Sequence, residues 1–393
     1  MTSATANPVL RALPAAYVLV PTDQIARRPL VPWAADLRRE AAAAANAGGS
    51  TYDRVRCEEL IRCGNAAALV LANGGRADAA LRICEAEIVW VRRLAERYRR
   101  PGLRPLVVQP WINIGRLHAR GGRVEEARRH FDQVGRCSPA RPCPIADLVI
   151  QPDDWTEQDR DLDALREFCR TVLVVDTLRA LLANRRFEDV LAFAAERPAD
   201  GVDHLEPIVA EAELVALGRL QRLDEALARV DGYARRADSW ERIVIRLREA
   251  ELLVAAGVED RARRVIARLI DVCSRVDLAA KARVPFLLPI EHLLRIAWSL
   301  DLADEALSLA EAAYKAAQRL EDEPLQAGLL RLLAEAPGNP VRRAEFAAAL
   351  DRLIETTAYA RLRGGDGSAA PKAAPDTAVL DALFAELLAI LDT

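Results

Sequence analysis

The sequence predicts an all-α protein made of successive helical hairpins, and three observations predict that fold class. Apolar residues make up 51% of the 393-residue chain and aromatic residues only 5%, as in closely packed helices rich in Ala, Leu and Val. The run Trp111–Pro139 has the apolar spacing of two short helices joined by a glycine turn. A turn, then a small residue, then an apolar residue four positions later recurs along most of the chain.

Residues 1–35 are rich in proline and lack a helical period, and we expect them to form an extended arm. Arg11 interrupts their apolar stretch, which is not the pattern of a signal peptide. The first helix is expected from Ala34 to the pair Gly48-Gly49, because glycine commonly closes a helix. No segment reaches 18 uninterrupted apolar residues, so no membrane span is expected.

Six hairpins are then predicted, each with a glycine-containing or polar turn shortly before a small residue. These small-residue positions are Ala80, Ala127, Val190, Ala226, Ala262 and Ala306. We expect them at the contacts between helices, because the distance between two packed helices depends on the side chains at the contact. The longest step between them, from Ala127 to Val190, contains the least regular stretch, residues 138–163. Long loops in compact proteins are often functional.

The C-terminal part of the sequence predicts more helices and a linker. Beyond residue 320 a further pair of helices is expected, divided by the turn at Pro337–Pro340. Residues 364–376, GGDGSAAPKAAPD, have the composition of a flexible linker. Residues 377–393 form a last amphipathic helix, whose apolar face would not remain in water. We expect this helix to cap the last hairpin; a groove, or a second subunit in a homodimer, is the alternative position.

Within Trp111–Pro139, small residues stand where two helices would cross, and large apolar residues flank that contact. The residues that carry this pattern are Trp111, Ile114, Gly115, Gly122, Ala127, Phe131 and Pro139. At these positions the unit resembles a tetratricopeptide repeat, and neighbouring units match more weakly over roughly residues 60–320. The resemblance implies a TPR-like right-handed α-solenoid over residues 36–363, in which the first helix of each hairpin lines a concave groove.

The register of the repeat also indicates which side chains of the first helices face the groove. These candidate binding residues are Arg62, Asn65, Gln109, Asn113, Arg116, Arg179, Glu211, Glu251, Glu291 and Arg295. They would give the groove a basic first half and a more acidic second half. Asn and Arg suit an extended peptide, because they bond its backbone amides and its carboxylates. Ordinary solvated positions on helix surfaces are the alternative interpretation.

Sequence motifs for catalysis and cofactor binding are absent. The sequence has no GxxxxGK[ST] loop, no HExxH and no CxxC, so no cofactor and no metal is expected. Its seven cysteines are scattered and odd in number, which favours a reduced, cytoplasmic location over a disulfide framework. The net charge of -3 gives no reason to expect a nucleic-acid partner. His118 replaces an aromatic residue of the repeat and is expected to pack.

These observations favour a non-enzymatic protein that recognises a peptide or protein segment in its groove. Two alternatives belong to other functional classes. The first is an accessory or catalytic protein of a natural-product or modified-peptide pathway, which would bind its substrate in the same groove. The second is a sensor or regulatory protein that acts with a separate DNA-binding partner, since the sequence has no evident DNA-binding helix-turn-helix of its own.

Overall fold

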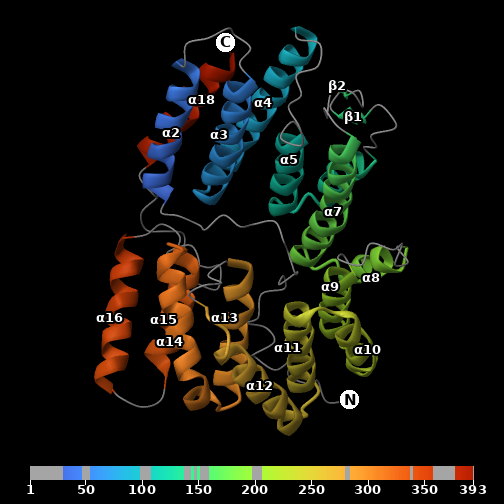
Figure 1. Cartoon of the computed structure of the whole chain (residues 1–393), viewed down its shortest axis with the longest axis vertical. Helices are drawn as coiled ribbons and strands as arrows, with labels where there is room; N and C mark the ends of the chain where they lie inside the picture. Colours follow the sequence, from blue (N-terminus) through green and yellow to red (C-terminus); the bar gives the residue numbers. More distant parts are fainter. Residues whose placement is uncertain are drawn as a thin grey trace. The chain divides into compact units, whose positions relative to one another are not determined.

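The computed structural model describes residues 30–46, 54–97, 108–136, 143–145, 148–150, 159–196, 206–278, 284–336, 340–356 and 377–392. In these ranges the chain is almost entirely helical, which confirms the predicted all-α class (Figure 1). The helices are α2 (Leu30–Asn46), α3 (Arg54–Asn73), α4 (Ala77–Arg97), α5 (Gln109–Arg120), α6 (Val124–Gly135), α7 (Asp159–Ala183), α8 (Phe187–Ala195), α9 (Glu206–Arg219), α10 (Leu223–Arg236), α11 (Ser239–Ala255), α12 (Glu259–Ser274), α13 (Val284–Ser299), α14 (Ala303–Arg319), α15 (Glu323–Glu335), α16 (Pro340–Thr356) and α18 (Thr377–Asp392).

The chain divides into two compact units. The first unit contains the described residues of Leu30–Ala180 and Ala370–Thr393, and the second contains those of Leu181–Ala369. The boundary between Ala180 and Leu181 falls inside α7, where no change in composition marks it. The expected arm at residues 1–35 lies almost entirely outside the described residues, and α2 begins at Leu30, earlier than the predicted start at Ala34.

The six predicted turns all have the same backbone form, with one residue in the left-handed region. These residues are Gly75, Gly122, Arg185, Gln221, Gly257 and Asp301. The next N–H along the chain donates to a carbonyl five residues back, as Arg123 N does to His118 O at 2.9 Å. This bond is that of the Schellman motif, which ends one helix and directs the chain into the next. Arg185, Gln221 and Asp301 adopt positive φ without glycine's freedom, at φ 59, 61 and 57.

The predicted small-residue positions lie in the contacts between helices. Ala80, Ala127, Val190, Ala226, Ala262 and Ala306 are all fully buried, each with 0% exposure. At Gly115 on α5, an added Cβ would lie 2.7 Å from Cε1 of Phe131 on α6. Phe131 is itself 0% exposed, so the α5–α6 crossing has no room for a larger residue at position 115.

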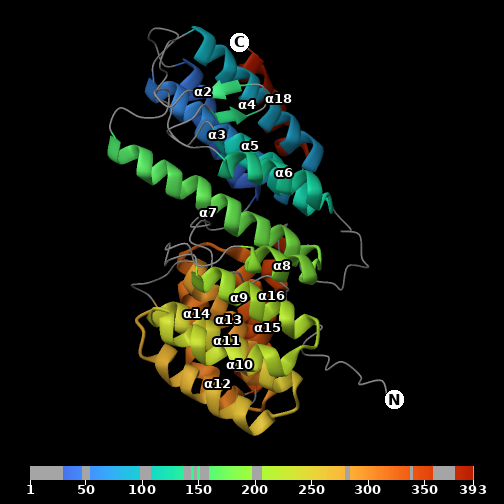
Figure 2. The same ribbon diagram turned by 90° about the vertical axis from the view of Figure 1, so that its right-hand side faces the viewer.

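In the second unit the first helices of successive hairpins form one layer. Helix α11 contacts both α9 and α13, and α13 contacts α15; the second helices α12 and α14 also contact each other (Figures 1 and 2). Their largest shared core runs through α11–α15, with Leu253, Ile266 and Leu294 among its fully buried residues. This layer brings side chains of α9, α11 and α13 together, although these helices are far apart in the sequence.

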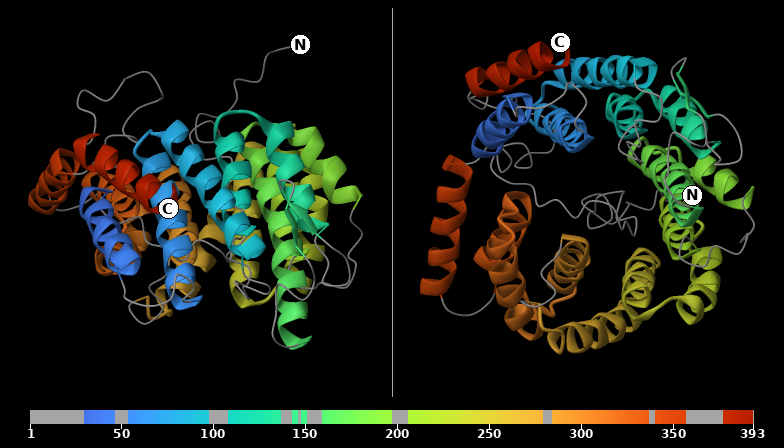
Figure 3. Two further views of the ribbon diagram at one scale, coloured as in Figure 1. Left: turned by 90° about the horizontal axis from the view of Figure 1, so that it is seen from above. Right: turned by 45° about the horizontal axis from the view of Figure 1, so that its top comes forward.

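The C-terminal helix α18 does not cap the last hairpin. It belongs to the first unit, where it packs against α2, α3 and α4 (Figure 3). Leu380, Leu383, Leu387 and Leu391 on its apolar face are at most 2% exposed. The expectation of a cap was wrong because the amphipathic pattern shows that a helix must be covered but not which helices cover it. The predicted linker at 364–376 lies outside the described residues.

The irregular stretch at residues 138–163 is described only in part. It contains the strands β1 (Cys143–Ile145) and β2 (Leu148–Ile150), which pair antiparallel with Cys143 opposite Ile150. These are the only strands among the described residues, and α7 begins at Asp159. Within the described part of the chain, no helix is both long and apolar enough to cross a bilayer.

Candidate functional site

The candidate binding residues of the first unit lie on α3, α5 and α7, and three of them form an amide row: Gln109, Asn113 and Asn65. Gln109 Nε2 donates to Asn113 Oδ1 at 3.3 Å, and Asn113 Nδ2 donates to Asn65 Oδ1 at 2.9 Å. The Asn65 Nδ2 atom is buried and has no hydrogen-bond partner among the described residues. The row therefore joins α3 to α5 and leaves one amide donor unsatisfied.

Arg116 and Arg179 meet at an aspartate that the sequence did not single out. Arg116 donates from Nε and Nη2 to the two carboxylate oxygens of Asp176, each at 2.9 Å. Arg179 Nη1 lies 3.5 Å from Asp176 Oδ1. Asp176 is 4% exposed, whereas Arg116 and Arg179 retain 28% and 26% side-chain exposure. A bidentate pair of this kind fixes the arginine plane and neutralises much of its charge.

Two further arginines on α3 and α5 make polar contacts outside the amide row. Arg120 Nη1 donates to Asn73 Oδ1 at 3.3 Å and ties the end of α5 to the end of α3. Arg62 was also predicted to face the groove, but its side chain is 60% exposed and pairs with Glu59 on its own helix. The structure does not join Arg62 to the amide row.

In the second unit, Glu211 and Glu251 belong to a buried arginine cluster with Arg248 and His292. Arg248 Nη2 donates to Glu211 Oε1 at 2.7 Å, and its Nη1 donates to Glu251 Oε2 at 2.6 Å. His292 Nε2 lies 2.6 Å from Glu251 Oε1. Glu211 and His292 are 0% exposed, Arg248 is 3% and Glu251 11% exposed. The cluster connects α9, α11 and α13.

Opposing effects set the protonation states of this cluster. Burial acts to raise the pKa of the Glu251 carboxyl, but Arg248 and His292 together outweigh this effect and hold that pKa at about 2. Burial lowers the pKa of His292, so a neutral imidazole donates from Nε2 to Glu251. One arginine thus compensates two carboxylates in a dry environment, where an uncompensated charge is costly.

Glu291 and Arg295 form a separate pair on α13. Arg295 Nη2 donates to Glu291 Oε1 at 2.6 Å, and Glu291 is 1% exposed. A Cβ added at Gly328 on α15 would lie 2.1 Å from Glu291 Oε1. The structure therefore does not place Glu211 and Glu291 on an open, acidic surface. The prediction that these side chains face a groove used the register of a single hairpin. It could not take account of the neighbouring first helices, which cover these positions.

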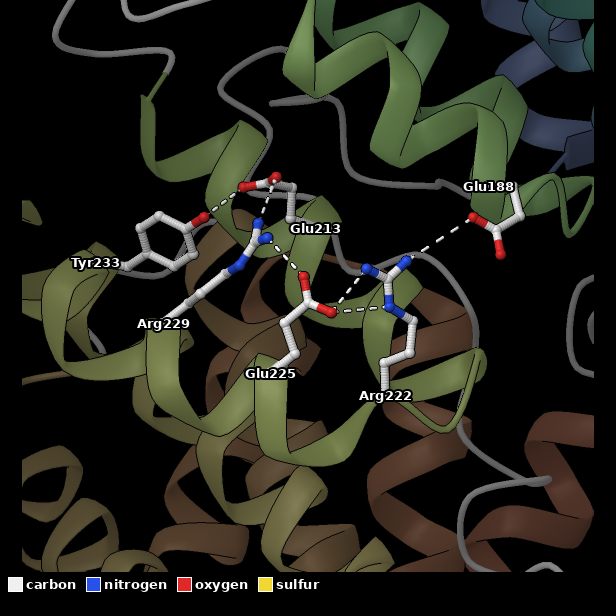
Figure 4. A network of polar contacts seen from close by, with 6 residues as sticks. All are labelled: Glu188, Glu213, Arg222, Glu225, Arg229 and Tyr233. Atoms are coloured by element: carbon white, nitrogen blue, oxygen red, sulfur yellow. Dashed lines mark hydrogen bonds and ion pairs between the residues drawn. The ribbon is translucent and has the colours of Figure 1, made fainter.

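A third network lies on α8, α9 and α10 (Figure 4). Arg229 bridges Glu213 at 3.0 Å and Glu225 at 2.7 Å, and Tyr233 donates to Glu213. Arg222 continues the chain of contacts to Glu225 and, at 3.9 Å, to Glu188. Burial, and then the Glu213 carboxylate, raise the pKa of Tyr233 to about 12. Most of these charges are at least a third exposed, so each pair stabilises the helices only weakly.

In the α5–α6 hairpin, three aromatic rings pack together. His130 lies 4.1 Å from Trp111 and 5.3 Å from His118, measured between ring centroids. His118 therefore packs on His130, as expected, and its Nδ1 accepts a hydrogen bond from Arg123 Nε at 2.8 Å. Burial, aided by the charge of His118, lowers the pKa of His130 to about 4. A neutral, stacked imidazole of this kind is part of the hairpin's packing.

Among the described residues, no group of three or more His, Cys, Asp and Glu side chains could hold a metal ion. Five described cysteines are buried thiols: Cys57, Cys63, Cys84, Cys169 and Cys273. Burial raises the pKa of Cys63 to about 11 and that of Cys273 to about 12, which removes thiolate character at neutral pH.

No protein-family model matches the chain, and no curated protein matches its sequence. The assignment of function therefore depends on the side chains themselves. The polar residues of α3, α5 and α7 supply amide and guanidinium groups from three different first helices. The residues of α9, α11 and α13 are buried and mutually compensated. Asp176, Arg248 and His292 complete these clusters. The sequence contained a signal for two of them, because Asp176 stands three residues before Arg179 and Arg248 three residues before Glu251.

Proposed function

We propose that this chain is a TPR-like helical repeat protein that binds an extended peptide segment through the amide row of its first unit. The single observation that carries the proposal is the chain of amides from Gln109 through Asn113 to Asn65, which ends on a buried Nδ2 donor that has no partner in the described part of the chain. Buried polar groups are normally satisfied, so an unsatisfied donor in a polar row is a place where a ligand carbonyl would bond.

The chemistry of the row favours recognition of a peptide backbone. A carboxamide both donates and accepts, as a peptide bond does, so a row of carboxamides can pair with successive backbone groups. Arg116 already directs two donors at Asp176, and this contact makes it a positioning residue for α5 and α7 in the proposal. Arg120 on α5 and Arg179 on α7 add guanidinium groups to the same unit, and these favour a segment with an acidic side chain or carboxylate.

The repeat architecture is part of the same proposal. Its support is the six turns of one form, the six fully buried small-residue positions, and the layer of first helices in the second unit. Helical repeats commonly present their first helices as a continuous recognition surface. On this basis we place the ligand on the first helices α3 and α5, and assign the outer helices to support.

The test is a peptide-display selection against the immobilised full-length chain, with a random linear library as the probe. Peptides enriched on the wild-type chain should lose at least tenfold in affinity for the Asn65→Ala, Asn113→Ala variant, because each lost amide removes hydrogen bonds of about 1 kcal/mol. The matched control is Gln133→Ala, an exposed amide on α6, which should bind as the wild type does. Equal losses in both variants, or no enriched peptide, would contradict the proposal.

A further inference from the structure

The carboxyl group of Glu87 on α4 lies against Gly64 on α3, the residue that precedes Asn65. A Cβ added at Gly64 would lie 2.2 Å from Glu87 Oε1 and 2.5 Å from Glu87 Cδ. Helices α3 and α4 pack directly on each other, so this contact is part of their crossing. The carboxyl group thus fills the space that a side chain at position 64, beside the amide row, would otherwise occupy.

Glu87 is completely buried, and its carboxyl group lacks a hydrogen-bond partner. Its exposure is 0%, and neither oxygen is bonded to any of the described residues. A buried carboxylate without a cation or a donor is costly, so the group is stable there only while it keeps its proton. Burial raises the pKa of Glu87 well above 4.5, in agreement with this geometry.

In the described part of the chain, the helices packed on α4 supply no compensating charge to Glu87. These helices are α3, α5 and α18. Cys63 on α3 and Cys84 on α4 lie within electrostatic reach of the carboxyl group, but thiols are weak donors. The charged and titratable groups of these helices have partners elsewhere: Arg62 with Glu59, Arg116 with Asp176, His118 with Arg123, Asp381 with Arg76, and Glu386 with Arg38. An ionised Glu87 would therefore be stabilised only by water that enters between α3 and α4.

A displacement at Gly64 reaches the amide row directly, because Asn65 is the next residue of α3. Asn65 Oδ1 accepts from Asn113 Nδ2 on α5 at 2.9 Å, and such a bond weakens steeply when its angle is disturbed. Arg120 and Asn73 also join α5 to α3, but their bond lies two helical turns further along α3. It does not hold Asn65 in place.

We propose that Glu87 is a positioning residue of the amide row, and that loss of its proton to bulk water releases Asn65 from Asn113 and weakens ligand binding. For its ligand, this inference rests on the proposed function. The direction follows from the site: below the folded pKa of Glu87 the carboxyl group is neutral and the row is intact. Binding falls as the pH rises through that pKa.

The test follows the side-chain amide signals of Asn65 and Asn113 by NMR, in the full-length chain labelled with ¹⁵N-asparagine and without ligand. Asn65→Ala and Asn113→Ala assign the signals. Between about pH 5 and 8.5 both signals should shift along one titration curve with a shared midpoint, whereas the Asn73 signal should move less. Signals of Asn65 and Asn113 that do not move in this range overturn the proposal.

Glu87→Gln keeps the size of the side chain but cannot ionise. In this variant the Asn65 and Asn113 signals should stay at their low-pH positions over the whole range; should it fail to fold, Glu87→Met serves the same purpose. The matched control is Glu85→Gln, which removes an exposed carboxylate two residues earlier on α4 and should titrate as the wild type does. A titration that persists without the Glu87 carboxyl group overturns the proposal.

Peptide affinity separates this inference from the proposed function. A peptide enriched on the wild-type chain should bind at least about fivefold more weakly at the upper end of the pH range than at the lower end, because the row loses a hydrogen bond. Glu87→Gln should bind it equally at both. Equal affinities for the wild type overturn the inference even where peptide binding is confirmed. If no peptide is enriched, the proposed function fails, and the NMR titration alone decides whether Glu87 positions the row.

Discussion

Replacing Arg248 by methionine tests whether the buried arginine cluster holds the first helices of the second unit together. Methionine keeps much of the length and volume of the side chain but removes every donor to Glu211 and Glu251. Two carboxylates with 0% and 11% exposure then lose their cation. Removing one partner from a buried ion pair typically costs about 3–5 kcal/mol, because the other charge stays in a dry environment.

The pKa of Glu251 gives a second estimate of the free energy of unfolding that the cluster contributes. It is held at about 2, against an ordinary value of 4.5. A difference of this size corresponds to about 3 kcal/mol of stability, at 1.36 kcal/mol for each pKa unit. Because the folded pKa is depressed, this contribution is present above pH 4.5 and is lost as the pH falls toward 2. Arg248 shares this effect with His292, so Arg248→Met should remove a large part of it at neutral pH, which is of the same order as the cost of breaking a buried pair.

The assay is urea unfolding at pH 7, followed by circular dichroism, with a loss of about 3–5 kcal/mol expected. The matched control is Arg246→Met on the same helix, where Arg246 is 33% exposed and its partner Glu249 keeps a second bond from Arg261. That control should lose less than about 1 kcal/mol. Adding Glu211→Gln to Arg248→Met should recover part of the loss. A loss no greater than that of the control would refute the account of the cluster.

Three further predictions concern single sites. Glu87 is 0% exposed and has no hydrogen-bond partner for either oxygen among the described residues, and burial raises its pKa well above 4.5. The stability of the wild type should therefore fall as the pH rises above 4.5, and Glu87→Gln should show a smaller fall between pH 4 and 8 in thermal melts. Burial, and then Asp322, raise the pKa of Glu323 to about 7. As the pH rises from 4.5 to 7, the free energy of unfolding of Glu323→Gln should therefore gain about 3 kcal/mol relative to the wild type. Equal pH slopes for the two chains would contradict this. Gly115→Ala should lose about 1–2 kcal/mol in urea unfolding through overlap with Phe131, whereas Gly232→Ala, whose nearest atom is 3.8 Å away, should gain up to about 1 kcal/mol; a gain at both positions would refute the packing argument.

The elements that could be predicted from the sequence are those fixed by contacts a few residues apart. The turns at Gly75, Gly122 and Gly257 follow from bonds that span no more than five residues. The turns at Arg185 and Gln221 contain no glycine, yet the small residue five positions later indicated both. Within one hairpin, then, local pattern and packing agree, and the hairpin positions could be read from the sequence.

The candidate site was predictable only where two neighbouring first helices face each other in the expected register. Asn65 and Asn113 were both selected from the sequence, and they are bonded to each other. Glu211 was selected as a groove residue, but it is buried because α11 brings Arg248 over it. A side chain's exposure depends on the next hairpin, and the spacing of residues within its own helix does not reveal that hairpin's position.

The sequence by itself determined that the chain is helical, where its hairpins turn, and that residues 377–393 form a helix with one apolar face. Tertiary structure alone decided which surfaces meet. Glu211 and Arg248 are 37 residues apart, and Arg38 and Glu386 are 348 apart. The physical reason is that the hydrophobic effect is not directional: the leucine stripe of α18 must be buried, but the stripe itself does not specify which helices bury it. The contact of α18 with Gly74 and its ion pairs with Arg38 and Arg76 select α2, α3 and α4, and these features come together only in the folded chain.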